Sequence, residues 1–387
     1  MDADSSSLAG MEETFHEAAR NATGLCDFGP QDYREGLRRL LSAYDSDMRF
    51  TEIGRQFAIG GIVGTLVQRL LSEEGWKSRP DCRSQPIRRP LVITGIPRTG
   101  TTALHKLLAL DPQFQGLEHW LTESPRVRPP RASWPSNPAF QASAAGLEAF
   151  FRMMPEMRKA HDMAADEVEE CLDVLRQSFV SNRFGASATI PSYDAWLFEQ
   201  DGQASYRRYA DVLRLIGADE PETRWLLKNP GHAAEMECLL AVFPDALIVQ
   251  THRDPVKAIP SLCSTLHMAR RMYEGNATRP ELIGPRETRY WSRAVARTER
   301  VRARRPDQFF DVDHRQFHAD PLEVVRTIYD RFGLTLSAAT LERMRRWVAA
   351  SPTRRYGEHR YVLEDYGVSA AQIHAAFADY IDRYRLA

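Results

Sequence analysis

Apolar side chains recur every three or four residues through the first part of the chain, which is the spacing of one face of a helix. Over residues 1 to about 50 this spacing predicts amphipathic helix, with apolar positions at Phe15, Ala18, Ala19, Leu37, Leu40, Leu41 and Tyr44. A second helix is predicted from about Gln56 to Ser72, and a polar, basic linker follows from Lys77 to Pro90. We therefore expect an N-terminal helical segment over residues 1–87.

The pattern changes at residue 90, where a short β-branched run, Pro90-Leu-Val-Ile-Thr-Gly-Ile, ends in a Gly/Pro turn. A helix is predicted directly after the turn, from Thr101. Two further units of strand, turn and helix begin at Trp225 and Ala246. Strands that alternate with helices predict a parallel sheet covered on both faces, so we expect an α/β domain over residues 88–387.

More than a hundred residues separate the first and second units, and they are rich in Trp, Phe, Met and Pro. We interpret residues of about 118–222 as a helical insertion, within which residues 167–175 are predicted to form an amphipathic helix. The C-terminal third is predicted to be helical over Pro321–Phe332, Ser337–Ala350 and Ser369–Tyr384. A basic loop, Thr353-Arg-Arg-Tyr-Gly-Glu-His-Arg-Tyr361, lies between the last two.

Composition excludes several classes of protein. The chain of 387 residues has a net charge of −1, so its overall charge does not favour a nucleic-acid partner. Its five cysteines are scattered without a Cys-x-x-Cys pair, which favours a reducing compartment and argues against disulfides and zinc. The acidic, polar N-terminus and the lack of a long apolar run predict a cytoplasmic protein that does not span a membrane.

The loop Gly95-Ile-Pro-Arg-Thr-Gly-Thr-Thr102 joins the first strand to its helix and is suited to bind an anion. Such a turn directs several backbone N–H groups and the helix dipole at one point, and Thr101 and Thr102 add hydroxyl groups. The two glycines have the spacing of a nucleotide-triphosphate loop, but Thr101 stands where that loop needs lysine. The cation here is Arg98, inside the loop.

A second set of polar groups follows the strand that ends at His252. Arg253 offers a forked donor there, and Ser261, eight residues later, offers a hydroxyl group one or two helical turns away. Taken alone, the segment is also a good helix start, with Asp254 as the cap and Pro255 in the first turn.

These two segments together resemble the donor site of the PAPS-dependent sulfotransferase family, in its bacterial branch; PAPS is 3′-phosphoadenosine 5′-phosphosulfate. The loop around Arg98 resembles the family's 5′-phosphosulfate loop, and Arg253 with Ser261 resembles its 3′-phosphate site. The resemblance covers roughly residues 88–385 and extends to residues 226–232, 319–333 and 357–367. It weakens at Asp313-His-Arg-Gln-Phe-His, where a Tyr-x-x-Leu strand end is commoner.

The resemblance implies a P-loop-like three-layer core and transfer of a sulfuryl group from PAPS to a hydroxyl group, leaving adenosine 3′,5′-bisphosphate. Arg98 and the loop N–H groups would stabilise the leaving phosphate, so no metal is expected. The residues that the resemblance assigns to the donor are Arg98, Thr99, Gly100, Thr101, Thr102, Arg253, Ser261, Arg355 and Gly357.

The chemistry also requires a base that takes the proton of the acceptor hydroxyl. Lys228 ends a strand, where it can supply a further cation at the carboxyl edge of the sheet. His232 is the first choice for the base, because animal cytosolic sulfotransferases carry a Lys-x-His element at about this distance before the 3′-phosphate arginine. A histidine at a helix start can equally cap or pack. The alternatives are glutamates, as in some glycosaminoglycan sulfotransferases: Glu118, Glu123 and, on the insertion, Glu167, Glu169 and Glu170.

The insertion has many aromatic and Met residues and few clustered basic ones, so we expect a small or lipid-like alcohol or phenol as the acceptor. A homodimer is compatible with the sequence. Two other functions stay open. One is a P-loop-like nucleotide or small-molecule kinase, which predicts a lysine after Gly100 and magnesium-binding aspartates. The other is a non-catalytic nucleotide-binding protein of the same fold.

Overall fold

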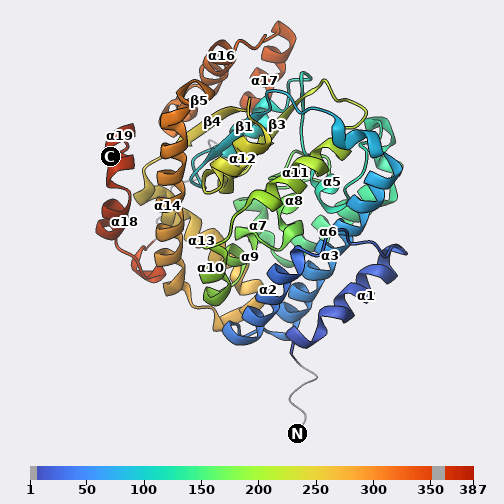
Figure 1. Cartoon of the computed structure of the whole chain (residues 1–387). Helices are drawn as coiled ribbons and strands as arrows, with labels where there is room; N and C mark the ends of the chain where they lie inside the picture. Colours follow the sequence, from blue (N-terminus) through green and yellow to red (C-terminus); the bar gives the residue numbers. More distant parts are fainter. Residues whose placement is uncertain (1–6, 351–361) are drawn as a thin grey trace. The chain divides into compact units, whose positions relative to one another are not determined.

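The structure is a computed structural model and describes residues 7–350 and 362–387 (Figure 1). The chain forms two compact units. Unit 1 comprises Met1–Pro86, Glu118–Pro221 and Thr265–Arg279, and unit 2 comprises Ile87–Leu117, Glu222–Ser264 and Pro280–Ala387. Among the described residues, no helix is both long enough and apolar enough to cross a membrane.

Unit 1 is built from helices, and its core lies among the N-terminal three. Phe15 of α1, Leu40 of α2 and Leu66 of α3 are buried in one apolar cluster, to which Phe179 and Tyr193 of the later segment also belong. The helices are α1 (Glu12–Thr23), α2 (Tyr33–Asp47), α3 (Glu52–Ser78), α5 (His119–Glu123), α6 (Pro138–Met153), α7 (Pro155–Ala160), α8 (Leu172–Leu175), α9 (Asn182–Ser187), α10 (Pro191–Leu197) and α11 (Gln203–Ile216).

The ends of the N-terminal helices are set by residues that typically terminate or cap a helix. Gly24 adopts a left-handed conformation, with a φ of 71°, and its N–H bonds the carbonyl of Arg20, so α1 ends there. The amphipathic pattern over the first 50 residues therefore corresponds to two helices. Thr51 caps α3 by accepting a hydrogen bond from the N–H of Gly54, and this helix is longer than the predicted Gln56–Ser72.

The predicted helix over residues 167–175 is wrong for most of its length, because only α8, Leu172–Leu175, is helical. The backbone before it pairs with the segment that starts at Glu118. The N–H of His119 bonds the carbonyl of Glu167 at 2.9 Å, and Glu118 and Val168 form an antiparallel bridge. Backbone groups that are used across these two segments are not available to a helix.

Unit 2 contains a five-stranded sheet in the order β2-β3-β1-β4-β5, and every strand pair in it is parallel. The strands are β1 (Leu91–Gly95), β2 (Phe114–Gln115), β3 (Arg224–Lys228), β4 (Leu247–His252) and β5 (Phe309–Asp313). Figure 1 shows β1 between β3 and β4. The predicted α/β class with a central parallel sheet is confirmed.

Helices cover both faces of this sheet. Alternate strand residues such as Ile93 and Val249 share an apolar cluster with Leu104 of α4, Ile328 of α16 and Met344 of α17. On the opposite face, Arg302 of α14 donates to the side chain of Gln250 on β4 at 3.3 Å. The helices of this unit are α4 (Thr101–Leu108), α12 (Met236–Val242), α13 (Pro255–Glu274, of which residues up to Ser264 belong here), α14 (Ile283–Arg304), α15 (His314–Ala319), α16 (Pro321–Phe332), α17 (Ala338–Ala350), α18 (Ala370–Ala376) and α19 (Ala378–Tyr384).

Candidate functional site

The loop between β1 and α4 has backbone conformations that residues with a Cβ atom rarely adopt. Gly95 has a φ of 140° and Gly100 a φ of 93°, and Arg98 between them has a φ of 69°. A methyl group added at Gly95 would lie 2.5 Å from the carbonyl oxygen of Thr251 on β4, so only glycine fits there. The tight turn that the sequence predicts is therefore present, and it is set by the closeness of β4.

The threonines of the loop divide into buried and accessible groups. Thr99 is buried, and its hydroxyl donates to the carbonyl of Ile96 at 2.7 Å and lies 2.5 Å from the hydroxyl of Thr251. Thr101 is also buried, at the first position of α4, while Thr102 beside it is half-buried. The hydroxyl of Thr99 is therefore used to hold the loop against β4, and the N–H group of this residue is what it can offer an anion.

The structure brings together three of the residues that the sequence singled out in two separate segments. The Nε of Arg98 donates to the hydroxyl of Ser261 at 3.1 Å. The Nη1 of Arg253 donates to the carbonyl oxygen of Arg98 at 2.8 Å. Because β1 and β4 are neighbours in the sheet, the segments that follow their carboxyl ends meet at one edge. Two arginines and a serine thus converge beside the glycine loop.

The start of α13 has both features expected for residues 253–261. The carboxylate of Asp254 accepts a hydrogen bond from the N–H of Val256 at 2.9 Å, and Pro255 begins the helix. The helix-start interpretation is therefore right. It is compatible with a binding role, since Arg253 just before the helix and Ser261 within it both bond Arg98.

Lys228 and His232 lie at the carboxyl end of β3, next to β1. Only 1% of Lys228 is exposed, and its Nζ lies 3.5 Å from the hydroxyl of Thr102, which directs the ammonium group toward the loop. His232 is fully buried in the short helix over Pro230–Ala233. Burial lowers the pKa of His232 to about 3, so its imidazole is neutral at physiological pH.

The glutamates that compete for the role of base belong to unit 1. Glu118 is buried and paired with Arg128, whose Nη2 lies 3.1 Å from its carboxylate; burial raises the pKa of Glu118 although Arg128 opposes this. Glu123 lies 3.5 Å from the Nε2 of His119, and this partner lowers the pKa of Glu123 despite the opposing effect of burial. Glu170 is half-buried, and its N–H donates to the carboxylate of Glu169 at 2.8 Å.

His314 adjoins the loop and was not among the residues selected from the sequence. A methyl group added at Gly100 would lie 3.6 Å from its ring. Burial, followed by the charge of Arg253, lowers the pKa of His314 to about 4. The available signal was its place at the end of β5, in the stretch where the family resemblance weakens. Arg355 and Gly357, assigned to the donor by resemblance, lie outside the described residues.

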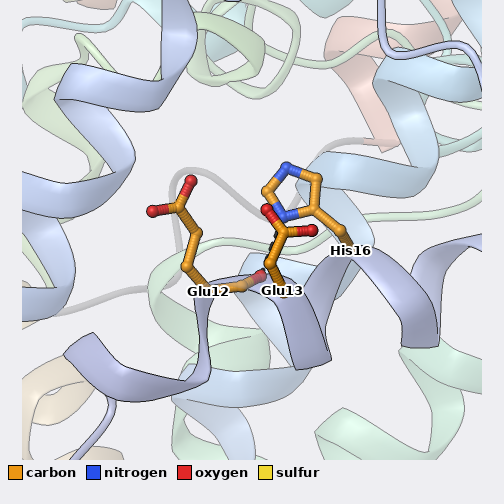
Figure 2. Close-up of side chains that lie close together, drawn as sticks. All are labelled: Glu12, Glu13 and His16. Atoms are coloured by element: carbon orange, nitrogen blue, oxygen red, sulfur yellow. Dashed lines mark hydrogen bonds between the residues drawn. The ribbon is translucent and has the colours of Figure 1, made fainter.

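A separate cluster of acidic and histidine side chains lies on α1 of unit 1, where Figure 2 shows Glu12, Glu13 and His16 close together. Arg34 of α2 pairs with both carboxylates, with its Nη1 2.5 Å from Glu12 and 2.8 Å from Glu13, and Arg38 pairs with Glu12 at 2.8 Å. His16 bonds the carbonyl of Glu12 through Nδ1 and the hydroxyl of Tyr33 through Nε2. Because these groups bond one another and Arg34, we interpret the cluster as an ion-pair network that joins α1 to α2.

The chain is similar to known sulfotransferases. The sulfotransferase family matches residues 90–338 of the chain. Sulfotransferase STF1 from Mycobacterium tuberculosis H37Rv is 39% identical, with a TM-score of 0.83 over 96% of this chain and 100% of that one. Sulfotransferase STF9 from Mycobacterium avium is 28% identical, with a TM-score of 0.86 over 100% of this chain and 99% of that one.

A curated relative extends the comparison. The omega-hydroxy-beta-dihydromenaquinone-9 sulfotransferase Stf3 of Mycobacterium bovis and of Mycobacterium tuberculosis is 24% identical over 304 residues, which are 76% of this chain and 74% of the relative. The family match spans the glycine loop, both arginines and Ser261. The chain belongs to the sulfotransferase family.

Proposed function

We propose that the chain transfers a sulfuryl group from PAPS to the hydroxyl group of a small or lipid-like alcohol or phenol. The observation that carries this proposal is the meeting of Arg98, Arg253 and Ser261 beside the glycine loop. PAPS has anionic groups on both its 5′ and 3′ ends, and each needs donors. The loop N–H groups with Arg98 suit the 5′-phosphosulfate, and Arg253 with Ser261 suits the 3′-phosphate.

In the reaction, the acceptor oxygen attacks sulfur while the bond from sulfur to the bridging phosphate oxygen breaks. The products are a sulfate ester and adenosine 3′,5′-bisphosphate. Negative charge grows on the departing oxygen, where Arg98 and Lys228 would stabilise it. His232, which follows Lys228 at the end of β3, is the proposed base for the acceptor's proton, and its imidazole is neutral at physiological pH. Glu118, Glu123 and Glu170 are the alternative bases.

The acceptor class rests on the character of unit 1 and on one relative. Several aromatic residues of residues 118–222 are core, since Trp120, Trp134 and Phe179 are buried. Others keep accessible apolar surface: Phe140 and Phe150 are half-buried, and Met153 is exposed. Stf3, which is 24% identical, is named for a hydroxylated menaquinone derivative. An apolar acceptor with a terminal hydroxyl group is consistent with both.

Calorimetric titration with adenosine 3′,5′-bisphosphate, and separately with ATP and Mg²⁺, tests the donor. We expect the bisphosphate to bind without metal and Arg253→Ala to weaken it. Arg326→Ala, which removes an exposed arginine of α16 in the same unit, is the matched control and should bind as the unaltered chain does. Failure to bind the bisphosphate, or binding of ATP with Mg²⁺ alone, would contradict the proposal and favour a kinase.

A transfer assay with labelled PAPS separates an enzyme from a protein that only binds the nucleotide. A panel of phenols, long-chain alcohols, quinols with a terminal hydroxyl group and sugars would define the acceptor. We expect sulfation of apolar alcohols or phenols in preference to sugars. Bisphosphate binding without transfer to any member of the panel would favour a non-catalytic protein.

A further inference from the structure

His252 ends β4 immediately before Arg253, and three side chains hold its ring. Its Nε2 lies 2.7 Å from the carboxylate of Asp311 on β5, and its Nδ1 lies 2.9 Å from the hydroxyl of Tyr380 on α19. The ring also stacks on Tyr384, with centroids 3.8 Å apart and an angle of 21° between the planes. Both ring nitrogens and one ring face are thus engaged, in a side chain that is 2% exposed.

The partners of His252 are fixed in turn by α14. Arg302 forms a two-pronged pair with Asp311, with N–O distances of 2.6 Å and 2.5 Å, and donates to the hydroxyl of Tyr384 at 2.8 Å. That hydroxyl donates to Glu299 at 2.6 Å. Figure 1 shows α19 alongside α14, as these bonds require. The polar network therefore joins β4, β5, α14 and α19 at His252, the residue that precedes Arg253.

The hydrogen-bond partners of His252 determine which of its ring nitrogens carries the proton. A carboxylate only accepts, so Nε2–H of His252 donates to Asp311 and Nδ1 accepts from Tyr380. Burial lowers the pKa of His252 although Asp311 raises it, which keeps the ring neutral. Hydrogen bonds from His252 and Arg302 keep the pKa of Asp311 below its ordinary value despite burial. A neutral imidazole is well suited to this place, because it offers one donor, one acceptor and an aromatic face.

The network affects the loop through Arg253. Its Nη1 holds the carbonyl of Arg98, a residue with a left-handed backbone that costs a non-glycine residue free energy. A hydrogen bond to that carbonyl helps to keep the peptide in its orientation. A shift of the strand end at His252 would move Arg253 away from both Arg98 and the 3′-phosphate.

We propose that His252 is a positioning residue for the donor, which fixes the end of β4 so that Arg253 meets the 3′-phosphate and the Arg98 carbonyl. This inference rests on the proposed function. It also assigns a role to the C-terminal helix, since α19 supplies both tyrosines that contact His252. His252 does not touch reacting atoms in this account and acts through Arg253.

His252→Phe tests the inference, since it keeps an aromatic ring but removes both hydrogen bonds. The measured quantity is the ratio of dissociation constants for adenosine 5′-monophosphate and adenosine 3′,5′-bisphosphate. The two ligands differ in the 3′-phosphate alone. We expect the variant to weaken bisphosphate binding about tenfold and monophosphate binding by a smaller factor, through the Arg98 loop, so that the ratio falls. His252→Gln retains a hydrogen-bond donor and an acceptor, so its ratio of dissociation constants should lie between those of His252→Phe and the unaltered chain.

The control is Tyr329→Phe, which removes another buried hydrogen bond of unit 2, from Tyr329 to Asp111 at 2.7 Å. It should lower the melting temperature without changing the ratio. A double-mutant cycle with Arg253→Ala adds a second test. In the Arg253→Ala variant, the further change His252→Phe should have no additional effect on bisphosphate binding. Additive losses, or a ratio that His252→Phe leaves unchanged, would overturn the positioning role.

If His252→Phe fails to fold, Tyr384→Phe gives the same test, because it keeps the stacked ring and removes the hydroxyl that Arg302 and Glu299 share. A selective, smaller loss of bisphosphate binding supports the inference, and no selective loss overturns it. If the unaltered chain does not bind the bisphosphate, the proposed function fails and this inference with it. If the unaltered chain binds but the variants keep the full ratio, the inference alone fails.

Discussion

Gly95→Ala should destabilise the chain more than an ordinary glycine substitution, because two penalties act at this position. Gly95 has a φ of 140°, a backbone angle that is unfavourable for any residue with a Cβ atom. The new methyl group would also lie 2.5 Å from the carbonyl oxygen of Thr251 and 2.7 Å from its hydroxyl. The carbonyl oxygen belongs to the backbone of β4 and cannot turn aside, so β1 and β4 must move apart.

The magnitude follows from adding the two effects. A left-handed conformation costs about 1–2 kcal/mol, and an overpacked contact about 1–3 kcal/mol, so we expect a loss of about 2–5 kcal/mol. This is a large share of the roughly 5–15 kcal/mol by which proteins are usually stable. Separation of β1 from β4 would also displace Arg98 from Arg253, so bisphosphate affinity should fall as well.

The matched control is Gly333→Ala at the end of α16. Gly333 has a φ of 63°, but a methyl group there would meet no atom within 4 Å. It therefore carries the conformational penalty without the clash, and should lose only about 1–2 kcal/mol and bind the bisphosphate normally. Urea unfolding and calorimetry on both variants measure the difference. Equal losses of stability, with unchanged affinity in Gly95→Ala, would refute the reasoning.

Three further outcomes are expected. Arg98→Ala should weaken bisphosphate binding by about tenfold to a hundredfold in calorimetry, as loss of a charge-assisted hydrogen bond does; an unchanged affinity would remove Arg98 from the donor site. His232→Gln should leave that affinity intact and lower turnover by about a hundredfold or more in the transfer assay, whereas unchanged turnover would point to a glutamate base. Because the pKa of His232 falls from 6.5 to about 3 on folding, the unfolded chain binds more protons between these values. The free energy of unfolding should therefore decrease from pH 7 to pH 5, less steeply in His232→Gln, and parallel curves would contradict this.

Local patterns in the sequence were enough to predict the elements that build the donor site. The β-branched run at Leu91–Gly95, its turn and the following helix are all signalled by neighbouring residues. The pairing of β1 with β4 brings Arg98 and Arg253 together, as the resemblance of the two segments to one donor site implied. The helix over Pro321–Phe332 has the predicted bounds, since Asp320 caps it and Gly333 ends it.

Features that depend on distant contacts were not predictable in this way. Residues 167–171 have a helical pattern, yet their backbone pairs with the segment at Glu118 and His119. His252 stood in the sequence only as a neighbour of Arg253, because its partners come from β5, α14 and α19. His314 was overlooked because its contact with Gly100 exists only once β5 joins the sheet.

The order of strands in the sheet has a consequence for how the chain folds. The central strand β1 pairs with β3 and β4, so Leu91 finds its partners only at Leu226 and Leu247. During synthesis, the apolar residues of β1 must wait until the whole of residues 118–221 and both later strands have been made. Contacts so distant in sequence slow folding, because long loops must close before they form. We expect nascent chains that end before β4 to expose β1 and to be the species most prone to aggregate.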